Sequence, residues 1–190
     1  MPLWGATDTD ESKPKNLTAA EKKEVFANAS GWVREAGSAL SGNDNASATP
    51  EVLVAIGGLA ASLGAADITE IEFVTTAFDK SDGGNIDVLV RFNEPVDIGG
   101  TPQFLVTNQT SSSRNITANY LSGTGTNEIT FRKTIAAGNA ATNASDVLKV
   151  VANPVSLNGG TVKDAGTTDN ATITSSVAIG TAAGTITVAA

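Results

Sequence analysis

The stretch from Ile86 to Asp164 constrains the fold more than any other part of this chain. Apolar residues occupy every second position at Ile86, Val88, Val90 and Phe92, and the alternation returns later in the stretch. Side chains on a β-strand point to opposite faces in turn, so this spacing gives one dry face and one solvated face. Turns rich in Gly, Asn and Pro separate the segments at intervals of about 8–12 residues. The pattern predicts an all-β antiparallel sandwich.

The expected strands of this sandwich follow from the alternation and the turns between them. They are 70–77, 86–92, 103–107, 115–121, 128–135, 147–151, 154–157 with 161–163, 171–178 and 184–189. Linkers such as 122–125 and 158–160 contain Gly and Asn, which tolerate positive φ in tight turns. Pro95 and Pro102 are expected beside strand ends, where a missing N–H disrupts pairing least.

The chain divides into two parts of different character. Residues 67–190 are predicted to form the sandwich, and residues 1–66 an extended N-terminal docking arm. The first sixteen positions contain only Leu3 and Trp4 as apolar anchors, too few to enclose a core of their own. We therefore expect the arm to gain order against a larger assembly.

Two local patterns lie within the arm. Thr18 and Glu21 have the spacing of a capping box, which favours a short helix through Ala27, with a fraying turn as the alternative. Residues 31–36 and 51–56 are predicted to pair as strands across a polar loop. The second segment also follows a good helix start, but its valines and the Gly pair after it favour a strand.

Composition excludes several classes of function. The chain has no Cys and no His, so disulfides, Cys/His zinc sites and Ser-His or Cys-His nucleophiles are ruled out. Its net charge is −8 without a basic patch, which argues against nucleic acid as a partner. The apolar run 52–63 is too short to span a bilayer, and the acidic start lacks the features of a secretory signal. We expect a protein made in a cytoplasm and not bound to a membrane.

Two groups of acidic residues are candidates for chemistry. One comprises Asp79, Asp82, Asn85 and Asp87, whose oxygens are of the kind that binds calcium. Their spacing does not match a helical calcium loop, so turn chemistry is the favoured interpretation. The other comprises the pairs Glu70 with Glu72 and Glu94 with Asp97, as glycoside hydrolysis would need. The first of these pairs is expected on the solvated face of one strand. We predict no catalytic residue, no metal site, no cofactor and no enzymatic activity.

Four separated motifs carry a resemblance to a known family. They are RFNEPV (91–96), GTPQF (100–104), YLSGTGTNEITF (120–131) and SLNGGTVKDA (156–165). Together they resemble the bacterial immunoglobulin-like repeat of large adhesins and surface proteins, over about residues 68–178. The resemblance implies an immunoglobulin-like sandwich with a role in adhesion or assembly.

A second resemblance concerns the beginning of the chain. LWG (3–5), ESKPK (11–15), GWV (31–33) and PEVLVAIGGL (50–59) resemble virion structural proteins of tailed marine phages, especially those of cyanobacteria. In such proteins a shared beginning precedes later domains that differ. The resemblance implies an arm that docks on other virion proteins and a sandwich that is displayed.

The docking residues expected from this interpretation are Leu3, Trp4, Trp32 and Val33. The alternative for both tryptophans is packing on the sandwich itself. The leading hypothesis is a capsid decoration protein bound to the major capsid protein, located in the virion. The alternatives are a tail-fibre or neck module that binds host surface glycans, and a cell-surface adhesin fragment. The segment 185–188 is a candidate for pairing with another chain in a homo-oligomer.

Overall fold

The computed structural model describes residues 17–28, 31–38, 44–55 and 65–190. Leu3 and Trp4 lie outside these residues. The N-terminal part contains α1 (Ala19–Lys23), β1 (Val25–Asn28), β2 (Gly31–Arg34) and β3 (Glu51–Ala55). The sandwich contains β4 (Ile68–Phe73), β5 (Phe78–Asp79), β6 (Gly84–Gly99), β7 (Gln103–Asn108), η1 (Ser112–Arg114), β8 (Ile116–Ser122), β9 (Thr126–Ile135), β10 (Val147–Lys149), β11 (Val155–Ser156), β12 (Thr161–Asp164), α2 (Val177–Ala182) and β13 (Thr185–Ala189).

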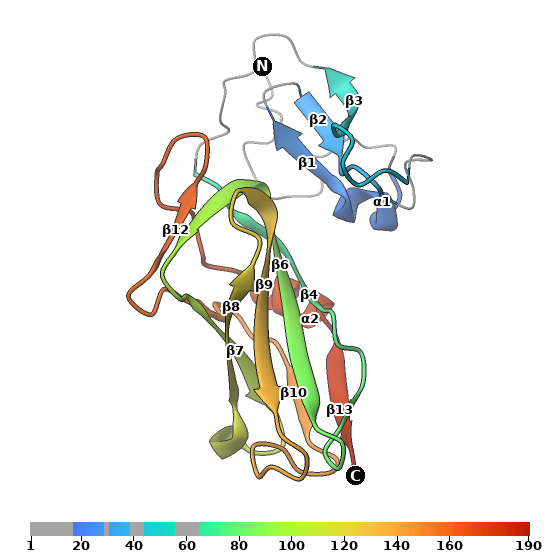
Figure 1. The fold of residues 1–190 in the computed structure, drawn as a ribbon, viewed down its shortest axis with the longest axis vertical. Helices are drawn as coiled ribbons and strands as arrows, with labels where there is room; N and C mark the ends of the chain where they lie inside the picture. Colours follow the sequence, from blue (N-terminus) through green and yellow to red (C-terminus); the bar gives the residue numbers. More distant parts are fainter. Residues whose placement is uncertain (1–16, 29–30, 39–43, 56–64) are drawn as a thin grey trace.

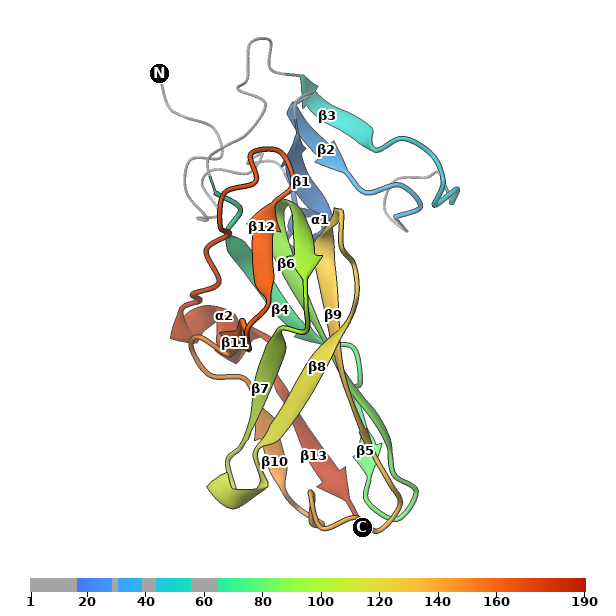
Figure 2. The same cartoon turned by 60° about the vertical axis from the view of Figure 1, so that its left-hand side comes forward.

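The sandwich is one ten-stranded sheet that curls over on itself. Its strand order is β12-β6-β9-β8-β7-β10-β13-β5, with β4 also beside β6 and β11 beside β7. The pairs are antiparallel except for β13 with β5, which run parallel. In Figures 1 and 2 the strands run lengthwise along an elongated body. The expectation of an all-β antiparallel sandwich is confirmed.

The core lies on the inner face of the curled sheet, at the positions that the alternation selects. Along β6 the residues Ile86, Val88, Val90 and Phe92 are all buried. Phe104 of β7 and Phe131 of β9 meet with ring centroids 5.5 Å apart, within the range of favourable aromatic contacts. The outward residues of these strands are mostly polar or charged, with Leu89 and Leu105 as exceptions, so one face of these strands is dry and the other faces outward.

The N-terminal part forms its own small sheet, of strand order β1-β2-β3. The expected pairing of the segments near 31–36 and 51–56 is confirmed, with Gly31 opposite Ala55 and Arg34 opposite Glu51. The capping box is also present, because the Thr18 hydroxyl accepts from the Glu21 amide and the Glu21 carboxylate accepts from the Thr18 amide. The helix ends at Lys23 and does not reach Ala27. The residues expected to form its last turn instead form strand β1, which pairs with β2.

Several details of the sandwich differ from the expectation. No strand spans 171–178, where only isolated bridges involve Asn170 and Thr172. The chain then turns into α2, whose first turn is capped by the Ser176 hydroxyl accepting from the Ile179 amide. Pro95 lies inside β6, at a point where the register with β9 shifts. Beyond this shift β6 pairs with β12, and the Pro95 carbonyl accepts from the Ala165 amide.

The C-terminal strand β13 lies between β10 and β5. β10 pairs with Thr185, Ile186 and Thr187, and the pairing with β5 covers Val188 and Ala189 at the end of the strand. Pairing of 185–188 with another chain stays a prediction. Figure 1 places this C-terminal end of the body opposite the end at which the N-terminal sheet sits.

Candidate functional site

The predicted docking residues Trp32 and Val33 are both buried in the N-terminal sheet. Trp32 is 3% exposed and Val33 is fully buried. Trp32 packs with Val25, and Leu17, Leu53 and Val54 lie around this pair. Docking through Trp32 and Val33 stays a prediction, and it requires these two side chains to become exposed. Packing of Trp32 on the sandwich is not seen, because the described residues of its cluster belong to the N-terminal part.

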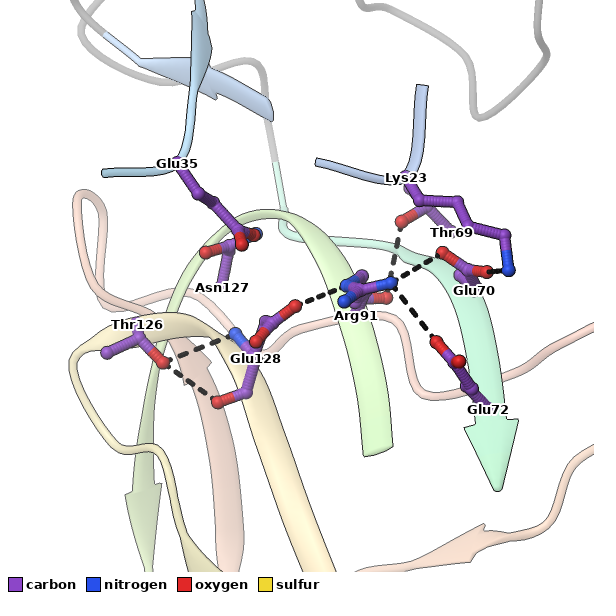
Figure 3. Close-up of polar contacts among 9 residues, drawn as sticks. All are labelled: Lys23, Glu35, Thr69, Glu70, Glu72, Arg91, Thr126, Asn127 and Glu128. Atoms are coloured by element: carbon purple, nitrogen blue, oxygen red, sulfur yellow. Dashed lines mark hydrogen bonds and ion pairs between the residues drawn. The ribbon is translucent and has the colours of Figure 1, made fainter. Parts of the chain in front are cut away.

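A group of charged and polar side chains lies where the N-terminal sheet meets the sandwich. We call this group the junction, and Figure 3 shows it. Its members are Lys23 and Glu35 from the N-terminal part, and Glu70, Glu72, Arg91, Asn127 and Glu128 from the sandwich. Two polar contacts cross it. Lys23 Nζ lies 2.9 Å from Glu70 Oε1, and Asn127 Nδ2 donates to Glu35 Oε1 at 3.4 Å.

The sheet register builds the sandwich side of the junction. Glu70 of β4 and Glu128 of β9 both lie opposite Arg91 of β6, one on each side. Directly opposed side chains on one face of a sheet approach closely enough to interact. Arg91 NH1 lies 3.0 Å from Glu70 Oε2 and 3.4 Å from Glu72 Oε2, and Arg91 Nε donates to Glu128 Oε1. One guanidinium group therefore contacts three carboxylates.

The two charged groups from the N-terminal part have different surroundings. Lys23 finds an acidic partner, and its hydrogen bond to Glu70 raises its pKa. Glu35 has no cation of its own among the described residues. Burial, followed by the negative charge of Glu128, raises the pKa of Glu35 from 4.5 to about 7. The junction therefore holds a carboxyl group that titrates near neutral pH.

Asp79 and Asp87, two of the residues singled out as a calcium candidate, are engaged in other contacts. Asp79 Oδ1 accepts from the Ser81 amide at 2.7 Å, as in an Asx turn. Asp87 forms a two-pronged ion pair with Arg132. Asp79 and Asp82 line a hollow of about 500 Å³ at the C-terminal end of the body. Among the residues that the structure describes, no three acidic side chains gather closely enough to hold a metal ion.

The glycine-rich loop at 123–125 joins the antiparallel strands β8 and β9, so it is a hairpin turn, as expected. Asn158 and Gly159 take positive φ angles of 47° and 76° in a tight turn between β11 and β12. That turn is not a hairpin, because β11 pairs with β7 and β12 pairs with β6. Glu70 and Glu72 share the outward face of β4, also as expected. Their surroundings differ from a solvated edge, because both contact Arg91.

Comparisons with known proteins do not extend this description. No family model, no curated protein and no solved structure matches the chain. Within the described part of the chain, none of the helices has the length and apolar character needed to cross a bilayer.

Sequence reasoning identified Glu70 and Glu72 but missed Glu35, Arg91 and Glu128. Each missed residue is an ordinary charged residue in its local sequence. Glu35 and Asn127 are 92 positions apart, so only the folded chain brings them together. One partial signal was present: Arg91 and Glu128 fall within two predicted strands, 86–92 and 128–135. Opposite charges on neighbouring strands are able to pair, but only the fold shows that these two strands are neighbours.

Proposed function

We propose that this chain is a virion structural protein of a tailed phage, and that it decorates the capsid. The N-terminal part attaches to other virion proteins, with the major capsid protein as the expected partner, and the sandwich is held outward. The observation that carries this proposal is the division of the chain into a small sheet at one end of an elongated β body (Figures 1 and 2). The resemblance of the opening residues to phage virion proteins supports the same division of roles.

The physical properties of the two parts suit these roles. The sandwich has one continuous apolar core and paired C-terminal strands, so it is built to stay folded without a partner. Among its described residues, the N-terminal sheet has a small apolar cluster around Val25 and Trp32. A small apolar cluster stabilises a three-stranded sheet weakly, so binding to a larger surface would add much of its stability. We propose a structural role without catalysis.

Attachment is expected to depend on the apolar anchors at the start of the chain. In the double variant Leu3→Ala and Trp4→Ala, binding to particles stripped of this protein should weaken by at least about tenfold, because aromatic anchors dominate interface energies. Quantitative co-sedimentation with the particles measures this. The matched control is Leu157→Ala, an exposed apolar residue of the sandwich, which should bind as the unchanged chain does. Equal binding by all three proteins would contradict docking through the arm.

The location on the particle is a separate test of the same proposal. Labelling of the protein in intact particles, followed by electron microscopy, should place it on the head. A label confined to the tail or neck would favour an appendage, and a label absent from particles would overturn the virion assignment.

A second candidate function, binding of host surface glycans, is favoured by one feature of the outer face. The register places Ser156, Gln103, Asn119, Arg132 and Asp87 in one row across five strands. Gln103 Nε2 donates to Asn119 Oδ1 at 3.0 Å, and Arg132 pairs with Asp87. Planar amide and guanidinium groups on the outer face of a sheet suit the hydroxyl groups of sugars.

This second candidate predicts binding to a glycan array through that row. Replacing both Gln103 and Asn119 by Ala should then abolish the signal, because it removes the two amides at the centre of the row. The control Ser113→Ala lies on an exposed residue of η1 outside the row and should leave the signal unchanged. An array without signal for the unchanged chain would exclude this function.

A further inference from the structure

Glu35 occupies an unusual position in the junction. It follows β2 directly, and its side chain points from the N-terminal sheet toward Asn127 and Glu128 of β9 (Figure 3). The Asn127 side chain is itself buried and donates its hydrogen bond to Glu35. This contact fixes the place of the Glu35 carboxyl group between the two parts of the chain. A charge on that group therefore interacts with charged groups of both parts.

The charges around Glu35 do not balance. Glu128 faces it from β9, Arg91 from β6, and Glu24 from the turn that precedes β1. Arg91 already contacts Glu70, Glu72 and Glu128, and Lys23 on α1 pairs with Glu70. Among the described residues the junction thus has the four carboxyl groups of Glu35, Glu70, Glu72 and Glu128 against two cations, and Glu24 adds a fifth carboxyl group nearby. Glu72 is 45% exposed and water solvates its charge, whereas Glu35 is mostly covered and has Asn127 as its hydrogen-bond donor.

We propose that Glu35 makes the contact between the N-terminal sheet and the sandwich sensitive to pH. The neutral carboxyl group lets the two parts pack. The carboxylate faces Glu128, has no ion-pair partner among the residues that the structure describes, and therefore drives the two parts apart. The inference concerns the junction alone and stands whether or not the chain is a virion protein. Its consequence is a contact between the two parts that is closed in mildly acidic solution and opens in alkaline solution.

The direction of the effect follows from the shifted pKa. Burial and the charge of Glu128 raise the pKa of Glu35 from 4.5 to about 7, and Arg91 with Asn127 offsets only part of this. A carboxyl group with a raised pKa in the packed state holds its proton more tightly there than in the separated state. Packing is therefore strongest below about pH 4.5, weakens as the pH rises toward about 7, and stays weak above that value.

A distance measurement between the two parts tests the proposal directly. The chain contains no Cys, so Val52→Cys in β3 and Leu121→Cys in β8 provide two unique sites for spin labels. Their side chains are 48% and 47% exposed, which leaves room for the labels. In the full chain we expect one narrow distance distribution at about pH 5.5. At about pH 8.5 the distribution should broaden to longer distances, with the packed fraction relative to the separated one reduced at least about tenfold.

Three further variants identify the group that is responsible. Glu35→Gln keeps the hydrogen bond from Asn127 and carries no charge, so its distribution should stay narrow at both pH values. Asn127→Asp places another acid beside Glu35 and should move the separation to lower pH. Glu72→Gln removes an exposed carboxylate of the same network and should respond as the unchanged chain does.

Several results would overturn the proposal. One is an unchanged distance distribution of the parent chain at the two pH values. Another is a Glu35→Gln variant that responds to pH like the parent, or an Asn127→Asp variant with the parent's midpoint. If Glu72→Gln also abolishes the response, the effect belongs to the overall charge of the junction and not to Glu35. A circular dichroism spectrum of each variant at both pH values confirms that the sandwich stays folded throughout.

Discussion

Replacing Asp146 by Ala should reduce the free energy of unfolding of the sandwich by about 3 kcal/mol, since it removes one partner from a buried charge pair. The Asp146 carboxylate is fully buried just before β10. It accepts from Arg114 through both oxygens, at 2.8 and 2.6 Å. It also accepts from Asn108 Nδ2 and from the Asn143 amide, each at 2.8 Å. One side chain thus joins β7, η1 and the loop before β10.

The Asp146 prediction has a matched control on the outer face of the sheet. Asp87 pairs with Arg132 in the same two-pronged geometry, at 2.7 and 2.6 Å. The Arg132 side chain is 39% exposed, however, against 22% for Arg114. Water replaces the lost contacts at an exposed pair, so Asp87→Ala should cost much less than Asp146→Ala. Urea unfolding followed by circular dichroism compares the two, and equal losses would contradict the argument from burial.

The same carboxylate gives the sandwich a defined response to acid. The hydrogen bonds from Arg114, with those from Asn143 and Asn108, outweigh burial and hold the pKa of Asp146 well below its usual 3.8. A group whose pKa is depressed by folding stabilises the folded state above its usual pKa and loses that contribution as the pH falls through the shifted value. Acid should therefore destabilise the unchanged sandwich more steeply than the Asp146→Ala variant.

The strands were predictable from sequence where the alternation is long. The segments at 86–92 and 128–135 lie within β6 and β9, because one face of each strand is committed to the core. The segment 171–178 has similar alternation, with Ala171 and Ile173 packed against the core. It forms no strand because its neighbours supply only isolated bridges. Burial of alternate residues is visible in a sequence, whereas the availability of a pairing partner is not.

The helix α2 and the junction were hidden for a related reason. Gly180 lies in α2 where an added Cβ would be 3.0 Å from the carbonyl oxygens of both Val150 and Val151. A glycine there lets the helix pack against that backbone. The local sequence does not show which backbone segment the helix will contact. The pKa shift of Glu35 was hidden for the same reason. Its surroundings depend on Glu128, which is remote in the chain, so its pKa shift becomes visible only in the folded structure.

Gly123→Ala is the second substitution with a large expected effect. Gly123 has a φ of +113°, a backbone conformation that residues with a Cβ rarely adopt. An added Cβ would also overlap the Glu128 carbonyl oxygen and lie 2.8 Å from Ile129 Cα. Both obstacles are backbone atoms of β9, which cannot rotate away as a side chain does. Strain and overlap together should cost about 3 kcal/mol in the free energy of unfolding.

A substitution at Gly125, in the same turn, measures the backbone strain without the atomic overlap. Its φ is +79°, but no atom lies within 4 Å of an added Cβ. Gly125→Ala should therefore show the backbone strain alone, about 1 kcal/mol, in the same urea unfolding experiment. Equal losses for the two variants would mean that the overlap with β9 is relieved without cost. If the overlap instead displaces Glu128, Gly123→Ala should also weaken the contact of Glu128 with Arg91, and so alter the pH response of the junction, whereas Gly125→Ala should not.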